Sequence, residues 1–324
     1  MCVKSLAKIP NIITPNFLPH IKELTSELVK KSFLNTLKQG PVIAAALICL
    51  VELFTCLGAH AVIYVKPFIT WVLDLMSESK FKTLNSIVLN SLVVSVQRTM
   101  DNFGGFLNPF YPKLIIAACE ITAWHQNQDG TLENMEYRQS SHRIKQFQMA
   151  LSRGISTHTL IAISKSCFDN IKKNPYAVIA LANIVKENIG ELDKTDVLAS
   201  STPLLDFFMH VFKFRYVLNG ILKLNMRTNT QKNRKKLFGF HNKYIINFIQ
   251  IYREDSDDET NVHLVEEAVG EAFMNFALKL SLDDFKPLYY RLFNLALDSN
   301  NLYGVSTLFH VTAQVANKLK SLFR

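Results

Sequence analysis

The sequence predicts an all-α fold, an α-solenoid in which antiparallel helix hairpins stack on one another. Hydrophobic residues make up 48% of the 324 residues and charged residues only 19%, so a large apolar surface must be buried. Glycine and proline number only 11 and 10, which leaves few turns. The apolar runs between these turns repeat with helical periodicity, and none alternates as a strand would. This combination favours helices that pack against other helices.

The most apolar stretch, residues 41–60, predicts the first helix of such a hairpin. Pro41 suits the first turn of a helix and Gly58 suits its end, which leaves about 16 residues, or roughly 24 Å of helix. A bilayer core needs about 30 Å, and the charge of Glu52 would be costly there. Because a second apolar helix follows at 64–76, we expect a buried αα-hairpin and no membrane contact.

A second hairpin repeats the pattern. Residues 86–100 predict an apolar helix, residues 101–105 a glycine-containing corner, and residues 106–124 the partner helix. Pro67 and Pro112 are 45 residues apart, each near the start of the second helix of its hairpin, and this period lies in the range of HEAT-type repeats. One such unit cannot bury its apolar face alone, and only stacked neighbours close the core. We therefore expect HEAT-type helical repeats over residues 1–135.

The remainder, residues 136–324, predicts further helices of the same solenoid. Ser156 offers a capping hydroxyl, and Asn174 followed by Pro175 predicts the start of a helix that ends at Gly190. The other expected helices cover residues 138–151, 194–215, 262–280, 281–298 and 302–323.

An irregular insert, residues 217–260, is expected to interrupt this helical pattern. Residues 217–253 hold eight lysines and arginines and no acid, so they supply most of the formal net charge of +9. Five of these residues form a candidate nucleic-acid-binding or nuclear-localisation patch: Arg227, Lys232, Arg234, Lys235 and Lys236. The alternative is a solvated loop or a translated non-coding stretch, and a charge run alone favours it. Ser256, ahead of three acids, is a candidate phosphorylation site, with an unmodified acidic loop as the alternative.

No motif predicts catalysis or ligand binding. The nine histidines are scattered, and no HExxH spacing, P-loop, GxGxxG or GxSxG occurs. Five cysteines without a CxxC pair favour buried free thiols over a zinc site: Cys2, Cys49, Cys56, Cys119 and Cys167. We therefore expect no catalytic residue, no cofactor, no metal and no small-molecule substrate.

Two features allow a functional or a structural interpretation. Four aromatic residues lie at helical spacing: Phe285, Tyr289, Tyr290 and Phe293. Basic neighbours, Lys286 and Arg291, would suit base stacking, but the spacing is more typical of a helix core whose edge their aliphatic stems cover. Glu52 suits a solvated edge position better than a pair across helices.

Several segments resemble one known family. The run VEEAVGEAFMNFALKLSLDDFKPLYYRLFNLALD, residues 265–298, and ANKLKSLF, residues 316–323, are similar to the C-terminal portion of the HEAT repeat-containing protein 1 family, also called U-three small nucleolar RNA-associated protein 10. Residues 103–115, 156–190 and 204–215 fit the same family in the same order. That family has a short loop where this chain has its insert, and it continues beyond KLKSLF through further helices.

The resemblance implies a non-catalytic scaffold of the small-subunit processome in ribosome biogenesis, located in the nucleus and nucleolus. It would help to couple transcription of the ribosomal RNA precursor to its processing. The implied partners are other processome proteins, with the ribosomal RNA precursor and small nucleolar RNA inside the complex. The alternative is a HEAT-type protein-interaction adaptor outside ribosome assembly, such as a transport or kinase-regulatory scaffold, because a fold does not fix a function.

Overall fold

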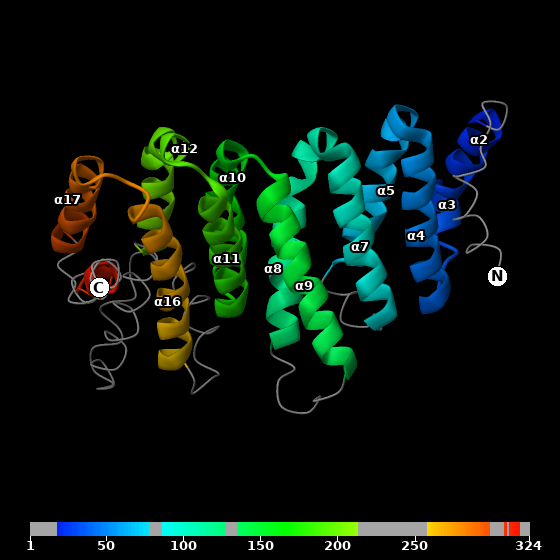
Figure 1. The fold of residues 1–324 in the computed structure, drawn as a ribbon. Coiled ribbons are helices and arrows are strands. Elements are labelled where there is room, and N and C mark those ends of the chain that lie inside the picture. The colour runs from blue at the N-terminus through cyan, green and yellow to red at the C-terminus, as the bar shows by residue number, and fades with distance from the viewer. Residues whose placement is uncertain are drawn as a thin grey trace, which may run out of the picture. The chain divides into compact units, whose positions relative to one another are not determined.

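The computed structural model describes residues 18–77, 86–126, 135–212, 258–298, 308–309 and 311–317. Every regular element in these ranges is an α-helix or a 3-10 helix, so the predicted all-α class is confirmed (Figure 1). The chain divides into two compact units, Met1–Thr159 and Leu160–Arg324. The expected division between residues 135 and 136 remains a prediction.

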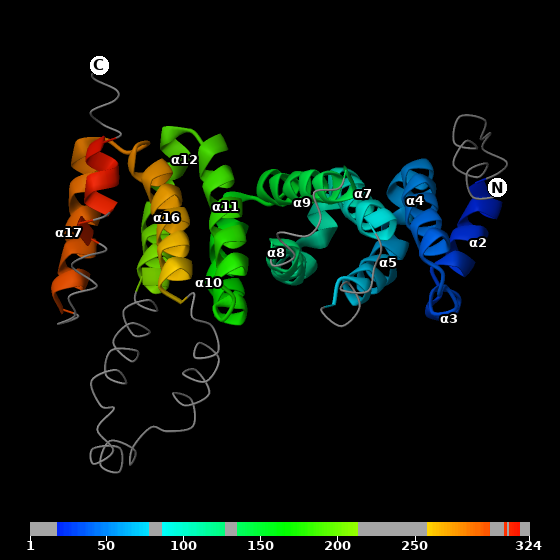
Figure 2. The same cartoon turned by 90° about the horizontal axis from the view of Figure 1, so that it is seen from below.

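Helices of the first unit form two layers, which Figure 2 shows from below. In one layer, α4 packs between α2 and α7, and α7 packs against α9. In the other layer, α5 packs between α3 and α8. The bounds are α2 (Leu18–Leu28), α3 (Lys31–Leu34), α4 (Gly40–Leu57), η3 (Gly58–Ala61), α5 (Val62–Leu75), α7 (Ser86–Phe103), η4 (Gly104–Phe110), α8 (Tyr111–Gln126) and α9 (Met135–Gly154).

The most apolar stretch forms the hairpin of α4 and α5. Helix α4 has Pro41 in its first turn and ends before Gly58, whose φ of 53° lies in the left-handed region that favours glycine. The 3-10 turn η3 follows, and the rings of Phe54 and Phe68 meet edge to face with centroids 5.2 Å apart. By length and composition alone, Gly40–Leu75 is apolar enough to cross a membrane. It is nevertheless broken at Gly58 and buries both phenylalanines completely, so the predicted buried hairpin is confirmed.

The second predicted hairpin is also present, with a longer corner than expected. Helix α7 ends at Phe103, whose ring packs edge to face on Phe54. The chain then forms η4, and α8 begins at Tyr111 instead of residue 106. Pro109 has no amide hydrogen with which to continue a helix, and the Tyr111 hydroxyl donates a 2.8 Å hydrogen bond to the Gly104 carbonyl. The tyrosine thus ties the corner to α8.

The second unit is also built in two layers. Helix α11 packs along α16 in one layer. In the other layer, the helix over 201–212 contacts α10 through His210 and Phe168, and α17 through Asp206 and Arg291. The bounds are α10 (Thr157–Ile171), α11 (Pro175–Glu191), α12 (Lys194–Ala199), α16 (Asp258–Ala277) and α17 (Leu282–Asp298), with further helical residues at 311–317.

Both predicted caps are confirmed. The Asn174 side chain accepts a hydrogen bond from the amide of Ala177, and the Ser156 hydroxyl accepts one from the amide of Thr159, both at 3.4 Å. The expected single helix over 194–215 is wrong, because a turn at Ser200 separates α12 from the 201–212 helix. Pro203 explains the break, since it has no amide hydrogen with which to extend the hydrogen bonds of α12.

Phenylalanine rings form the core of the second unit. Phe208 of the 201–212 helix meets Phe273 of α16 edge to face, with centroids 5.5 Å apart, and stacks on Phe276 at 6.1 Å. All three rings are fully buried. The two helices that flank the insert therefore share one core. The insert itself, as far as residue 257, lies outside the described residues, and α16 begins at Asp258.

Candidate interaction surfaces

The described residues hold no group of three or more His, Cys, Asp or Glu side chains that could bind a metal ion. None of the four described cysteines forms a disulfide bond, and three of them are buried. Burial raises the pKa of Cys167 to about 12, and burial, followed by the nearby Cys56 and Glu52, raises the pKa of Cys49. These thiols therefore stay protonated near neutral pH, where the thiolate would be the nucleophile or metal ligand.

The candidate residues of the insert lie outside the described residues. This applies to the basic patch, Arg227, Lys232, Arg234, Lys235 and Lys236, and to the candidate phosphorylation site, Ser256. Their roles remain predictions.

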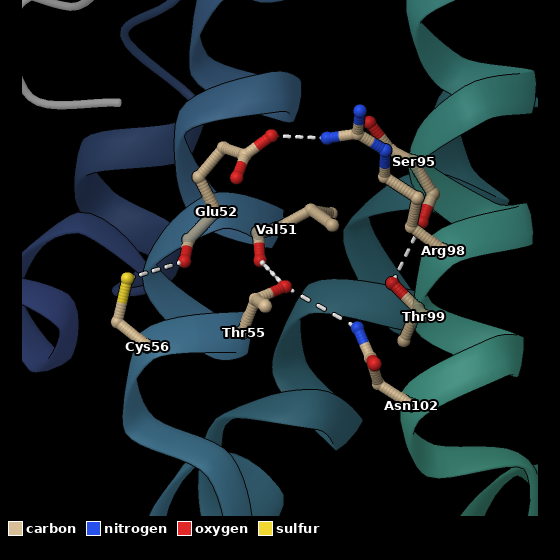
Figure 3. A network of polar contacts seen from close by, with 8 residues as sticks. All are labelled: Val51, Glu52, Thr55, Cys56, Ser95, Arg98, Thr99 and Asn102. Carbon is tan, nitrogen blue, oxygen red and sulfur yellow. Dashed lines mark hydrogen bonds and ion pairs between the residues drawn. The ribbon is translucent and has the colours of Figure 1, made fainter. Parts of the chain in front are cut away.

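A polar network joins α4 to α7 in the first unit (Figure 3). The Arg98 guanidinium donates to the Glu52 carboxylate, and the Asn102 amide donates a 3.2 Å hydrogen bond to the Thr55 hydroxyl. Glu52 was expected at a solvated edge without a cross-helix partner. That expectation is wrong, because Arg98 reaches it from the adjacent helix, although the Glu52 side chain keeps 27% of its surface exposed. The network links two neighbouring repeats through their side chains.

The corners of the two hairpins expose apolar side chains. Ile63, at the start of α5, is 72% exposed, and Phe106, in η4, is 59% exposed. Within η4 the neighbouring Leu107 is fully buried, so Phe106 points outward while Leu107 anchors the corner. We define the corner surface by six exposed residues within 58–67 and 103–113: His60, Ile63, Lys66, Phe106, Pro109 and Lys113.

In the second unit, residues of the KLSLDDFKPLYYRLF segment cap the start of α17 and form its buried face. The Ser281 hydroxyl accepts a 3.2 Å hydrogen bond from the amide of Asp284, which is a side-chain cap of the helix start. Leu288 and Leu292 are buried. The segment therefore has direct structural roles at its cap and along its buried face.

Side chains of α17 also connect it to its neighbours. The Arg291 guanidinium donates a 2.8 Å hydrogen bond to Asp206 of the 201–212 helix. The hydroxyls of Tyr289 and Thr312 lie 2.9 Å apart, which links α17 to the 311–317 helix.

Only part of the aromatic stripe of α17 packs against other rings, and the rest is exposed. Phe285 packs against Phe273 and Tyr289, as expected for a core. Tyr290 and Phe293, in contrast, are 54% and 37% exposed, so the expectation that all four aromatic residues form a core is wrong. Buried Leu288 and Leu292 occupy the inward face in their place. That the aliphatic stems of Lys286 and Arg291 cover the edge of this core remains a prediction, although the Arg291 guanidinium pairs with Asp206.

Ion pairs and charged hydrogen bonds also cross between helices of the second unit. Lys186 of α11 pairs with Glu271 of α16 at 2.5 Å. Asp169 of α10 lies 3.1 Å from the imidazole of His210 and 3.2 Å from the ammonium of Lys172. Burial opposes the charge of Asp169, but hydrogen bonds from His210 and Lys172 outweigh it and hold the pKa of this carboxyl below its usual value.

Known proteins are similar to this chain over most of its length. Residues 196–324 match the model of the BP28CT (NUC211) domain. HEAT repeat-containing protein 1 of Danio rerio is 23% identical over 87% of this chain and 11% of its own length. The Homo sapiens protein of that name is 19% identical over 87% and 11%, and the Drosophila melanogaster homolog is 20% identical over 95% and 13%. The chain resembles the HEAT repeat-containing protein 1 family.

This finding confirms the predicted resemblance. Together with the layered helices it also confirms the predicted class, an α-solenoid of HEAT-type helix hairpins. The chain spans about one tenth of the length of the HEAT repeat-containing protein 1 relatives that it matches. Helices α16 and α17, which carry the segment that resembles the family, lie inside the BP28CT match.

Proposed function

We propose that this chain belongs to a non-catalytic scaffold of the small-subunit processome, in ribosome biogenesis. The carrying observation is the similarity to HEAT repeat-containing protein 1 over most of the chain, with a BP28CT (NUC211) domain at residues 196–324. Stacked helix hairpins support it, since such solenoids bind partners through extended surfaces. The scaffold acts in the nucleolus, where transcription of the ribosomal RNA precursor is coupled to its processing.

The partners in this proposal are other processome proteins, together with the ribosomal RNA precursor and small nucleolar RNA in the same complex. No small-molecule substrate, cofactor or membrane takes part. The two exposed apolar regions, on the corners of the first unit and on α17, are consistent with a protein that works by presenting surfaces.

Affinity purification of the tagged chain from a nucleolar extract tests the proposal. Processome proteins and ribosomal RNA precursor should co-purify with the wild type. Recovery of transport or kinase-regulatory proteins in their place would contradict the proposal and support the adaptor outside ribosome assembly.

Two variants test whether the co-purification requires the folded chain. Leu292→Asp places a charge at a position that is only 2% exposed, and it should abolish the co-purification. Leu198→Asp is the matched control, because Leu198 is 46% exposed on α12, and it should leave the recovered proteins unchanged.

A further inference from the structure

Two corners of the first unit lie at the same edge of the stack. Figure 1 shows the turn between α4 and α5 beside the turn between α7 and α8. Helix α5 is in contact with η4, so the second helix of one hairpin adjoins the corner of the next. The corner surface defined above therefore draws its residues from contacting elements of two consecutive repeats.

The apolar residues Ile63 and Phe106 are largely exposed, whereas their neighbours anchor the hairpins. Phe103, Leu107 and Tyr111 anchor η4 from the inside, and each is at most 5% exposed. Phe106, between these anchors in the sequence, is 59% exposed. A methyl group added at the adjacent Gly105 would meet no atom within 4 Å, so open space lies beside the phenylalanine. A partner can therefore reach the Phe106 ring without any rearrangement of the corner.

The charge of the corner surface has one sign. Residues 58–67 and 103–113 contain His60, Lys66 and Lys113 and no acidic residue. All three basic side chains are exposed. The nearest acid in sequence is Asp101, in the last turn of α7, and Glu52 is engaged by Arg98. Lys66 lies one helical turn after Ile63 on α5, and Lys113 lies in the first turn of α8, directly after η4, so the lysines of this surface favour a negatively charged ligand.

We propose that the corner surface binds a short acidic segment of a partner protein, whose apolar side chains cover Ile63 and Phe106 while its carboxylates face Lys66 and Lys113. The inference rests on the proposed scaffold function and assigns it one protein-binding surface. An acidic peptide fits better than RNA, because two large exposed side chains of the surface, Ile63 and Phe106, are apolar and only two lysines accompany them.

Fluorescence polarisation with the full chain tests this assignment. The probe is a labelled peptide in which leucine and phenylalanine alternate with pairs of aspartate, and the control probe carries lysine in place of aspartate. The acidic probe should bind and the basic probe should not. Equal binding of the two probes, or binding of neither, would overturn the inference.

Matched variants locate the binding. Phe106→Ser and Ile63→Ser should each weaken the acidic probe by about tenfold, as for residues at the centre of an interface. Ile87→Ser, at a residue that is 56% exposed on α7, should leave binding unchanged. Loss of affinity in Ile87→Ser as large as that in Phe106→Ser would refute the location.

A charge series and an RNA competitor complete the test. Lys66→Glu and Lys113→Glu should weaken the acidic probe, whereas Lys31→Glu on α3 should not. Mixed-sequence single-stranded RNA should fail to displace the peptide from the wild-type chain. If the RNA displaces the peptide both from the wild type and from Phe106→Ser, the surface is an RNA site instead. Peptide binding without processome co-purification would refute the proposed function alone, and the reverse result would refute only the corner surface.

Discussion

The ammonium of Lys279, just after α16, donates a 2.7 Å hydrogen bond to the carbonyl of Gly190, near the end of α11. The same ammonium also reaches the carbonyl of Leu192. Carbonyls at the end of a helix have no intrahelical partner, and a positive charge there interacts favourably with the helix dipole. One repeat thus caps the helix of the preceding repeat in its own layer.

Replacing Lys279 should therefore weaken the second unit. Lys279→Met removes the charge and both hydrogen bonds, and we expect a loss of about 1 kcal/mol in the free energy of unfolding. Urea denaturation of the full chain measures this loss. Lys286→Met, at an exposed lysine of α17, is the control and should change the midpoint little. Equal midpoints for the two variants would show that the Lys279 contacts do not contribute.

Adjacent residues of α17 should respond differently to a charge. Leu292 is 2% exposed and Phe293 is 37% exposed. Leu292→Asp should cost about 3 kcal/mol or more, because it buries an unpaired carboxylate, whereas Phe293→Asp should cost about 1 kcal/mol or less. Thermal unfolding followed by circular dichroism separates the two. If Phe293→Asp were the more damaging variant, the orientation of α17 described above would be wrong.

The pair of Glu52 and Arg98 should contribute weakly and depend on salt. Both side chains retain solvent contact, so we expect a coupling of about 0.5 kcal/mol in a double-mutant cycle with Glu52→Gln and Arg98→Gln. The coupling should shrink as salt rises, because ions screen exposed charges. A parallel cycle on Thr55 and Asn102, which share a neutral hydrogen bond, should show no such salt dependence.

Acid should weaken the contact between α10 and the 201–212 helix. The pKa of Asp169 is lower in the folded chain than its ordinary value of 3.8, so the unfolded chain binds the proton more readily. The contribution of Asp169 is therefore complete above pH 3.8 and is lost as pH falls through the lowered folded pKa. Asp169→Asn should flatten the dependence of unfolding midpoints on pH in this acid range. An unchanged slope would contradict the role of His210 and Lys172.

Local signals in the sequence were sufficient for most helix boundaries. Pro41 and Gly58 mark the ends of α4, and Asn174 caps α11, because each acts through its own backbone or side chain. The break before the 201–212 helix had a local signal too, in Pro203, but the apolar periodicity on either side obscured it.

The orientation of exposed residues could not be predicted in the same way. Helical spacing places Tyr290 and Phe293 on α17, yet their exposure depends on which side the 201–212 helix and α16 cover. The partner of Glu52 is likewise 46 residues away in the sequence. Contacts between distant segments decide both outcomes, and periodicity contains no information about them.

The packing of α11 along α16 determines how the chain should be cut for expression. The BP28CT match begins at residue 196, which leaves α11 outside it, although α11 supplies the surface that α16 covers and accepts the Lys279 hydrogen bonds. A fragment trimmed to the match would strip α16 of that support, remove the Lys186 partner of Glu271 and open the α11-facing side of α16 to water and to aggregation. A recombinant fragment should therefore begin before α10, so that α11 stays packed on α16, and not at the start of the family match.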